Sequence, residues 1–224
     1  MRFIFRRLCC LLLAAVLCFA MAACQGKEPP DTGYTRYTTQ FFDTFATIIQ
    51  ITGYTKTQEE FEGYAQFVHE RFAHLSKLYD RFYEYTGVNN VRTINQNAGV
   101  APVEVEPELL EMLAFAKDQC QRSGGRVNIA MGPALELWHG YRERYAGMAL
   151  PEDAPDAYPA MEALEEADQL SQLDKVIIDK DAGTVFLEEP GMALDVGAVA
   201  KGYAAQLVAD QVYQEGFHSF ILSA

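Results

Sequence analysis

Cysteine and tryptophan are scarce in this sequence of 224 residues. It has one tryptophan and five cysteines, and four of the cysteines lie within the first 24 residues, so only Cys120 remains further along. A chain that loses its first segment therefore has no internal disulfide. There is no Cys-x-x-Cys pair, and the four histidines show neither metal-ligand spacing nor a readable Ser-His-Asp arrangement. We expect these histidines to be surface or core residues.

Positive charge is also scarce. The 18 Lys and Arg residues face 31 Asp and Glu residues, which gives a formal net charge of −13. Loss of residues 1–23 removes three arginines and changes the charge to −16. Such an excess of negative charge argues against binding to nucleic acid, or to an anionic membrane surface through charge. No nucleic-acid partner is expected.

The one long apolar run, Leu8 to Ala20, follows an arginine-rich start. It is too short to span a bilayer comfortably, and small residues precede Cys24, which favours a cleaved export signal over residues 1–23. The letters MAAC resemble a bacterial lipobox, although Met21 stands where Leu is preferred. This resemblance implies lipidation of Cys24 and a lipid-anchored protein on the extracytoplasmic face of the cell membrane. An ordinary signal peptide and an uncleaved anchor are the alternatives.

The remaining sequence suits a polar tether over residues 24–36 and one domain over residues 37–224. The pattern predicts an α+β (mixed α/β) domain in which strands pack against several helices. Strands are expected at 41–54, at 217–223 and on either side of a turn at Lys180–Gly183. Helices are expected from Thr57 to Phe82, from Pro107 to Gly124 and from Val199 to Gln214. The acidic region 147–169 is expected to be a surface excursion with a short helix.

Residues 193–204, ALDVGAVAKGYA, place one acid and one base at the predicted start of a helix. Free backbone N–H groups at a helix start, next to the bare backbone of Gly197, can approach a phosphate closely. Lys201 adds a positive charge there. Asp195 can cap the helix or accept a hydrogen bond from a ligand hydroxyl or ring N–H. The alternative is a tight packing corner in which Asp195 is only a cap and Lys201 is solvated.

A second segment, GGRVNIAMGPALELWHGYRE at residues 124–143, combines a glycine break, a short apolar strand and the sole tryptophan. Its triplet Asn128-Ile129-Ala130 is followed by Gly-Pro and then by Leu-Trp. Together with DVGAVAKGYA at residues 195–204, this segment resembles the ApbE family, the FAD:protein FMN transferases. Weaker likenesses upstream align Phe42 and Tyr85 with the family's Met and Tyr positions. The resemblance covers about residues 40–224.

The resemblance implies an ApbE-like (T-fold-like) domain that transfers the FMN moiety of FAD, through a phosphodiester bond, to a threonine of a partner flavoprotein. AMP is the other product. The family's acceptors are NADH:quinone oxidoreductase or Rnf-type subunits. Phosphoryl transfer of this kind usually needs Mg²⁺, which prefers oxygen ligands.

The resemblance also implies roles for individual residues. It assigns FAD contacts to Phe42, Tyr85, Asn128, Ile129, Ala130, Asp195 and Lys201, and it assigns an Mg²⁺ ligand to the backbone carbonyl of Ala198. Asn128 stands where the family has an acid, and Ala130 stands where it has a threonine, so two polar contacts are weakened or lost. From the residues alone, Phe42 and Tyr85 suit core aromatics, and Trp138 is expected in the core. No catalytic residue is assigned.

The family pattern continues past the strand that ends at Ala224, so the sequence is expected to be a fragment that lacks the C-terminal part and its metal ligands. Two other functions stay open. An FAD pyrophosphatase would use water as the acceptor, and a lipid-anchored flavin-binding protein would do no chemistry.

Overall fold

A computed structural model describes residues 33–147 and 158–224. The expected signal at 1–23, the expected lipidation site Cys24 and most of the tether lie outside the described residues. The chain divides into Met1–Thr35 and Arg36–Ala224, and the helices and strands that the structure describes lie in the second unit, apart from Thr35 at the start of β1. Within the described residues, no helix combines the length and the apolar character needed to cross a membrane.

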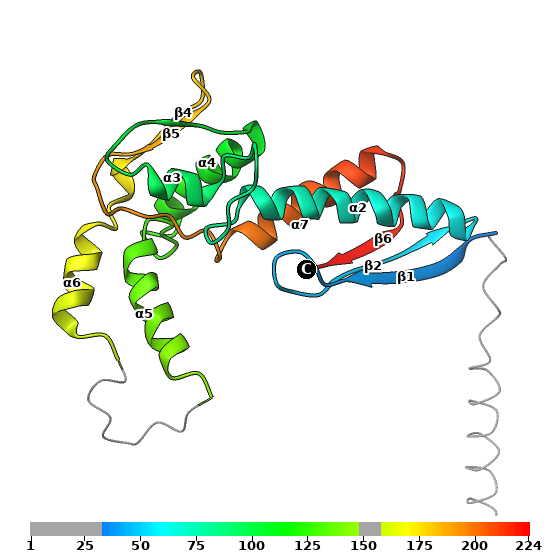
Figure 1. Cartoon of the computed structure of the whole chain (residues 1–224). Helices are drawn as coiled ribbons and strands as arrows, with labels where there is room; N and C mark the ends of the chain where they lie inside the picture. The colour runs from blue at the N-terminus through cyan, green and yellow to red at the C-terminus, as the bar shows by residue number, and fades with distance from the viewer. Residues whose placement is uncertain (1–32, 148–157) are drawn as a thin grey trace, which may run out of the picture. The chain divides into compact units, whose positions relative to one another are not determined.

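The first sheet has the strand order β1-β2-β6, with β1 at Thr35–Phe41, β2 at Ile49–Thr55 and β6 at Phe220–Ser223. Strand β6 runs antiparallel to β2, so the end of the chain joins a strand from its beginning (Figure 1). The tether predicted for residues 24–36 ends too late in the sequence, because β1 already begins at Thr35.

The single strand expected at 41–54 is wrong, since the chain leaves the sheet between β1 and β2. In this connection Phe45 and Ala46 have φ angles of 52° and 48°. Two successive residues in the left-handed region are incompatible with an extended strand. The sheet therefore receives two strands where the Phe, Thr and Ile content indicated one.

Two long helices cover this sheet. Helix α2 spans Gln58–Leu78 and helix α7 spans Ala200–Gln214. They pack on each other, α2 packs on β2, and α7 packs on β6 (Figure 1). Thr57 caps α2 by accepting a hydrogen bond from the Glu60 N–H. Both predicted helices are confirmed, but α2 ends four residues before Phe82, because Asp80 opens a turn by accepting the N–H groups of residues 82 and 83.

The second sheet has the order β3-β5-β4, with β3 at Val103–Glu104, β4 at Val176–Asp179 and β5 at Thr184–Leu187. A 3-10 turn at Leu173–Lys175 precedes β4. The predicted hairpin around Lys180–Gly183 is confirmed by the antiparallel pairing of β4 and β5. Helix α4, Pro107–Arg122, packs on β4 with the predicted proline in its first turn, and the short helix α3, Val91–Gln96, packs near β5.

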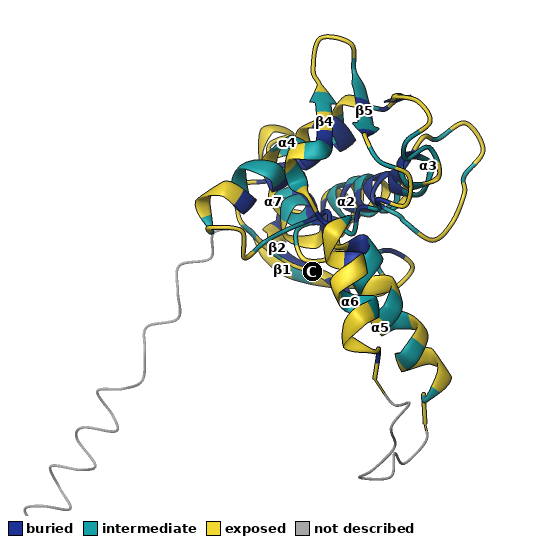
Figure 2. Cartoon of the chain, turned by 90° about the vertical axis from the view of Figure 1, so that its left-hand side faces the viewer, coloured by how far each residue is buried: buried dark blue, intermediate teal, exposed yellow. Residues whose placement is uncertain are grey.

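Helices α5, Gly132–Arg144, and α6, Met161–Gln169, pack on each other and bury few residues of their own (Figure 2). Helix α6 is the short helix expected in the acidic region, of which residues 148–157 lie outside the described part. The short apolar strand expected before Gly132 is wrong, because that segment turns directly into α5. Trp138 was expected in the core but lies on α5 with 45 % of its surface exposed.

Candidate functional site

Asp195 lies in a corner that leads into α7. The helix cap is Val199, whose side chain makes no capping hydrogen bond. Instead, Asp195 Oδ1 accepts the N–H of Gly197 at 2.9 Å. Asp195 therefore shapes the corner rather than capping the helix, which corrects one of the two roles that the sequence suggested.

Two segments, one at Asn95 and one at residues 129–132, form hydrogen bonds with the backbone that leads into this corner. The Asn95 side chain accepts the Leu194 N–H at 2.7 Å and donates to the Leu194 carbonyl at 3.0 Å. The Asp195 N–H donates to the Ile129 carbonyl at 2.8 Å, and the Gly132 N–H donates to the Ala193 carbonyl at 3.1 Å. The backbone before Asp195 is thus fixed on both sides by hydrogen bonds.

In front of the corner is a cavity of about 540 Å³. Its walls come from the connection between β1 and β2, from the end of α2 with the turn after it, and from the corner itself. The residues that line it include Asp43, Phe45, Ala46, Tyr79, Asp80, Arg81, Phe82, Tyr85, Asp195, Gly197 and Lys201. Of the residues that the sequence implicated in FAD contacts, the structure brings Tyr85, Asp195 and Lys201 together.

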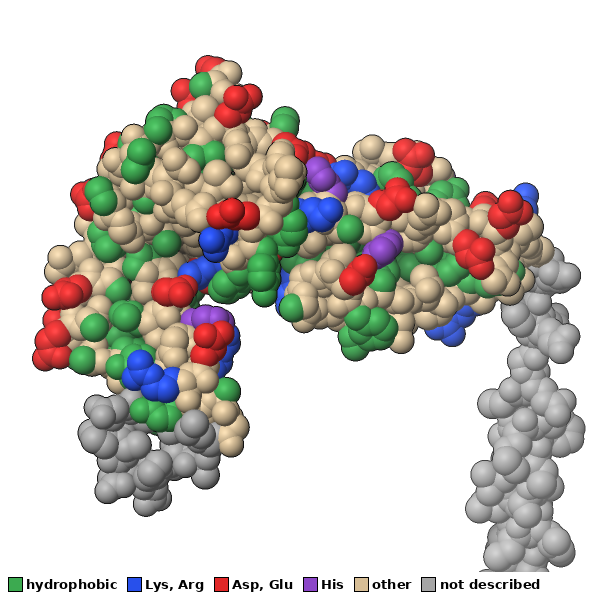
Figure 3. Space-filling view, in the orientation of Figure 1, with side chains coloured by type: hydrophobic (Ala, Val, Ile, Leu, Met, Phe, Trp, Pro, Cys, Tyr) green, Lys and Arg blue, Asp and Glu red, His purple; other side chains and the backbone are tan. Residues whose placement is uncertain are grey.

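Lys201 supplies a positive charge to the cavity from the first turn of α7. Within residues 33–147 and 158–224, its side chain forms no ion pair and no hydrogen bond. At the start of α7 the N–H groups of Val199 and Ala200 already donate to the Val196 carbonyl, at 2.9 and 2.8 Å. The helix dipole still favours an anion beside this end of the helix. The cavity therefore offers an anionic ligand the ammonium group of Lys201 and the start of a helix, although its lining also carries the carboxylates of Asp43, Asp80 and Asp195. Elsewhere acidic side chains are spread over the surface (Figure 3).

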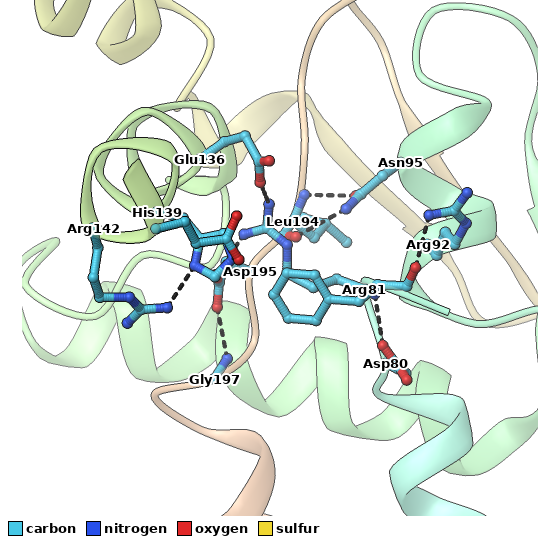
Figure 4. Close-up of polar contacts among 12 residues, drawn as sticks. Asp80, Arg81, Arg92, Asn95, Glu136, His139, Arg142, Leu194, Asp195 and Gly197 are labelled. Carbon is cyan, nitrogen blue, oxygen red and sulfur yellow. Dashed lines mark hydrogen bonds and ion pairs between the residues drawn. The ribbon is translucent and has the colours of Figure 1, made fainter. Parts of the chain in front are cut away.

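Sequence reasoning missed Arg81, which lines the same cavity. Its Nη1 donates to Asp195 Oδ2 at 2.6 Å, and its Nη2 donates to Glu136 on α5 (Figure 4). The Arg81 side chain is only 12 % exposed. Partners 114 positions apart in the chain leave no local pattern, so no sequence signal pointed to this contact.

The Tyr85 hydroxyl donates a hydrogen bond to Asp80 Oδ2 at 2.7 Å. Burial, followed by the hydrogen bond to the Asp80 carboxylate, raises the pKa of Tyr85 to about 12. The phenol is therefore neutral at physiological pH. The Tyr85 side chain lines the cavity and is not a core aromatic.

Phe42 is 60 % exposed, so it is not a core aromatic. It directly precedes the lining residue Asp43 but does not itself line the cavity. In the same connection the Thr44 hydroxyl is buried without a hydrogen-bond partner in the described chain. Left-handed residues and an unpaired buried hydroxyl are costly, and such strain concentrates at functional sites.

The triplet at 128–130 does not line the cavity. The Asn128 side chain donates to the Ser171 carbonyl at 2.8 Å and accepts the Ala130 N–H at 2.9 Å. The side chains of Ile129 and Ala130 are buried, with 1 % and 0 % exposed. These side chains serve the loop and the core, and the triplet reaches the corner only through the Ile129 carbonyl.

Ala198 is exposed and lines a second cavity of about 590 Å³ between α4 and α7. In the described residues only His74, Glu106 and Glu108 form a group of three metal-binding side chains, in which His74 Nε2 lies 3.1 Å from Glu106 Oε2 and 3.3 Å from Glu108 Oε2. Glu108 is also paired with Arg71. Since Mg²⁺ takes six oxygen ligands in near-octahedral geometry, the Ala198 carbonyl alone does not make a magnesium site.

The sequence matches the family model of the ApbE family over residues 45–224. A protein of Klebsiella pneumoniae named FAD:protein FMN transferase is 34 % identical over 143 residues, which are 62 % of this chain and 42 % of that protein. A protein of the same name from Haemophilus influenzae is 24 % identical over 94 % of this chain and 57 % of its own length. The chain thus spans about half the length of these curated relatives.

Solved structures agree in fold. The flavin transferase ApbE from Vibrio cholerae superimposes with a TM-score of 0.69 at 16 % identity, over 85 % of this chain and 57 % of that one. The ApbE protein of Thermotoga maritima gives 0.68 at 20 % identity, over 84 % and 57 %. These likenesses confirm the predicted mixed α/β, ApbE-like fold. With a family match over residues 45–224, this chain belongs to the ApbE family.

Proposed function

We propose that this chain is part of an enzyme that transfers the FMN moiety of FAD, through a phosphodiester bond, to a threonine of a partner flavoprotein. The observation that supports it best is the cavity lined by both Asp195 and Lys201, in which Lys201, in the first turn of α7, has no ion pair with a described residue. Relatives that share this family carry the name FAD:protein FMN transferase.

The residues suit such a substrate in distinct ways. Lys201, together with the positive end of the α7 dipole, would neutralise charge on the pyrophosphate of FAD. Asp195 has lone pairs left on both carboxylate oxygens and would accept a ring N–H or a hydroxyl of the ligand. Phe45, Phe82 and Tyr85 give the cavity aromatic faces on which a flavin or an adenine can stack.

In the transfer, the threonine oxygen forms a bond to the phosphorus of the FMN half. The bond from that phosphorus to the bridging oxygen breaks, and AMP leaves with that oxygen. The threonine proton must pass to a base, and we assign that role to none of the described residues. What the chain supplies is positioning and charge neutralisation, which dominate the catalysis of such transfers.

We further propose that the reaction uses Mg²⁺, with the Ala198 carbonyl as one ligand. A bound magnesium ion neutralises charge on the transferring phosphoryl group. The other ligands would be substrate phosphates, water or residues outside the described part. Chelation should then stop transfer while FAD still binds to the cavity.

The acceptor and the location are also part of the proposal. The acceptor is a flavoprotein with a modifiable threonine, such as an NADH:quinone oxidoreductase or Rnf-type subunit, on the extracytoplasmic side. The chain reaches it from a lipid anchor at Cys24. Cys24→Ala should release the protein from membranes, and tight association of that variant after signal removal would refute the anchor.

Calorimetry with FAD tests the binding site. Lys201→Ala should weaken FAD binding about tenfold or more, because it removes a charged partner of the phosphates. Lys180→Ala is the matched control, since Lys180 lies at the β4–β5 hairpin and is paired with Glu111. An unchanged affinity in a folded Lys201→Ala variant would place the ligand elsewhere.

The products separate the proposal from its alternatives. With FAD, Mg²⁺ and an acceptor protein, transfer gives a fluorescent acceptor band with the mass of added FMN, together with AMP. Free FMN and AMP without a modified acceptor would identify a pyrophosphatase. Binding of FAD without either product would identify a flavin-binding protein.

A further inference from the structure

We propose that Arg81 is a positioning residue, which holds the Asp195 carboxylate in the orientation that receives the ligand. This inference rests on the proposed function, because the ligand is taken to be FAD. No feature of the sequence that pointed to the site includes Arg81, and its role follows from its contacts alone.

The turn that carries Arg81 is itself rigid. Asp80 Oδ1 accepts the Phe82 N–H at 2.6 Å, and the Phe82 carbonyl accepts a hydrogen bond from Arg92 at 2.7 Å. The Asn90 amide donates to the Tyr83 carbonyl at 2.9 Å. Side chains thus fix the backbone that follows Arg81, and before it the Asp80 carbonyl accepts the Arg92 N–H at 3.0 Å. The Arg81 guanidinium lies 5.2 Å from the ring centre of Phe82.

From this turn the guanidinium reaches two other elements. One Nη group donates to Asp195 in the corner, and the other donates to Glu136 on α5 (Figure 4). The planar fork of an arginine sets the angle between two such bonds, which a lysine cannot do. Arg81 is 12 % exposed and Asp195 is 21 % exposed, whereas Glu136 is 62 % exposed, so the bond to Asp195 is the better shielded one.

The two carboxylate oxygens of Asp195 have different partners. Oδ1 accepts from the Gly197 N–H, and Oδ2 accepts from Arg81. These two bonds fix the rotation of the carboxylate and leave one lone pair on each oxygen for the cavity. Without Arg81 the carboxylate can turn about its side-chain bond, and a partly buried charge loses its partner. The ligand would then have to order the carboxylate on binding, which lowers affinity.

The test compares FAD affinity and the Gly197 amide resonance in matched variants. Arg81→Ala should weaken FAD binding about tenfold or more, since a charge-assisted bond is broken and its partner is left unpaired. Arg81→Lys should restore part of this loss. Arg122→Ala is the control, because Arg122 also pairs with an aspartate, Asp118, but is 72 % exposed and on α4. It should change affinity by less than about twofold.

A double-mutant cycle shows whether Arg81 acts through Asp195. In the Asp195→Asn background, Arg81→Ala should have almost no further effect on FAD affinity, because its target is gone. A general loss of structure would instead add to the effect of Asp195→Asn. Additive effects, or an unchanged affinity in Arg81→Ala, would overturn the proposal.

The ligand-free measurement keeps the inference separate from the proposed function. The Gly197 N–H is bonded to Asp195, so its amide resonance reports the orientation of the carboxylate. Arg81→Ala should shift it, and Arg122→Ala should not. If the unaltered protein binds no FAD, the proposed function fails. The Gly197 resonance still tests the role of Arg81, because a resonance that does not move in Arg81→Ala refutes the positioning role. If the alanine variant does not fold, Arg81→Met, which keeps an unbranched apolar side chain but has no charge and no donor, takes its place in every arm.

Discussion

Helices α5 and α7 both begin beside the Asp195 corner, yet they are held in different ways. Helix α7 buries Ala200, Ala204, Val208 and Val212, which succeed one another at intervals of four residues. Helix α5 buries only Gly132 at its start. One helix is anchored along its length by an apolar stripe, and the other by its first turn, by α6 and by the ion pair from Glu136 to Arg81.

The two helices therefore contribute differently: α7 contributes mainly to the stability of the fold, and α5 mainly presents exposed side chains near the site. The stripe of α7 holds Lys201 and the helix start firmly at the cavity, because burial of apolar surface is the main stabilising term. Helix α5 instead presents exposed side chains, among them Leu135 and Trp138, beside Arg81 and Asp195. We infer that α7 forms a firmly held wall of the proposed FAD cavity, whereas α5, which does not line that cavity, is held less firmly beside Arg81 and Asp195.

The largest expected effect is a charge placed in the stripe of α7. Val208→Asp should lower the free energy of unfolding by about 3–5 kcal/mol, because Val208 is fully buried and the new carboxylate has no partner. Leu135→Asp on α5 should cost less than about 1 kcal/mol, since Leu135 is 39 % exposed. Urea unfolding monitored by circular dichroism measures both, and equal losses would erase the distinction between the helices.

A smaller effect concerns the start of α5. A Cβ atom at Gly132 would lie 2.3 Å from the Ala193 carbonyl oxygen, so Gly132→Ala must displace either α5 or the backbone before Asp195. We expect a loss of about 1–3 kcal/mol and weaker FAD binding.

Gly140→Ala is the matched control on the same helix, because a Cβ atom there meets nothing within 4 Å. It should raise the free energy of unfolding by about 0.5–1 kcal/mol, as alanine favours a helix interior over glycine. If Gly132→Ala were as well tolerated as this control, the first turn of α5 would not be its anchor.

The sequence predicted well the long helices that bury an apolar stripe, and it predicted less well the segments without one. The stripes of α2 and α7 repeat at helical spacing, so their residues alone predicted the helices. Trp138 was misplaced because an aromatic residue in a helical segment says nothing about whether a partner covers it. The single strand predicted at 41–54 was wrong because Phe45 and Ala46 adopt left-handed φ angles. Glycine usually marks such angles in a sequence, and no glycine stands at these two positions.

The site divides likewise. Asp195 and Lys201 belong to one short motif, so local sequence was enough to bring them together. Arg81 joins them through folding, across 114 positions, and only the folded chain reveals it. The triplet that begins at Asn128 aligns with the family motif, but its side chains do not line the cavity. Asn128 forms hydrogen bonds within the loop, and the other two side chains are buried in the core, which the sequence did not indicate.

The smallest expected effect is a separate response of α5 to mild denaturant, and the sole tryptophan makes it measurable. Trp138 is 45 % exposed and touches the ring of Tyr158 at a centroid distance of 6.3 Å. Acrylamide should quench its fluorescence readily in the native state. In urea, the Trp138 signal should change at a lower concentration than the circular dichroism, which reports mainly α2, α4 and α7, because elements with few buried apolar contacts open at lower free energy. The control moves the reporter to α7 with Tyr213→Trp in a Trp138→Phe background, since Tyr213 is 55 % exposed. That reporter should change together with the circular dichroism. Coincident transitions for both reporters would show that α5 unfolds with the rest of the domain and is as firmly held as α7.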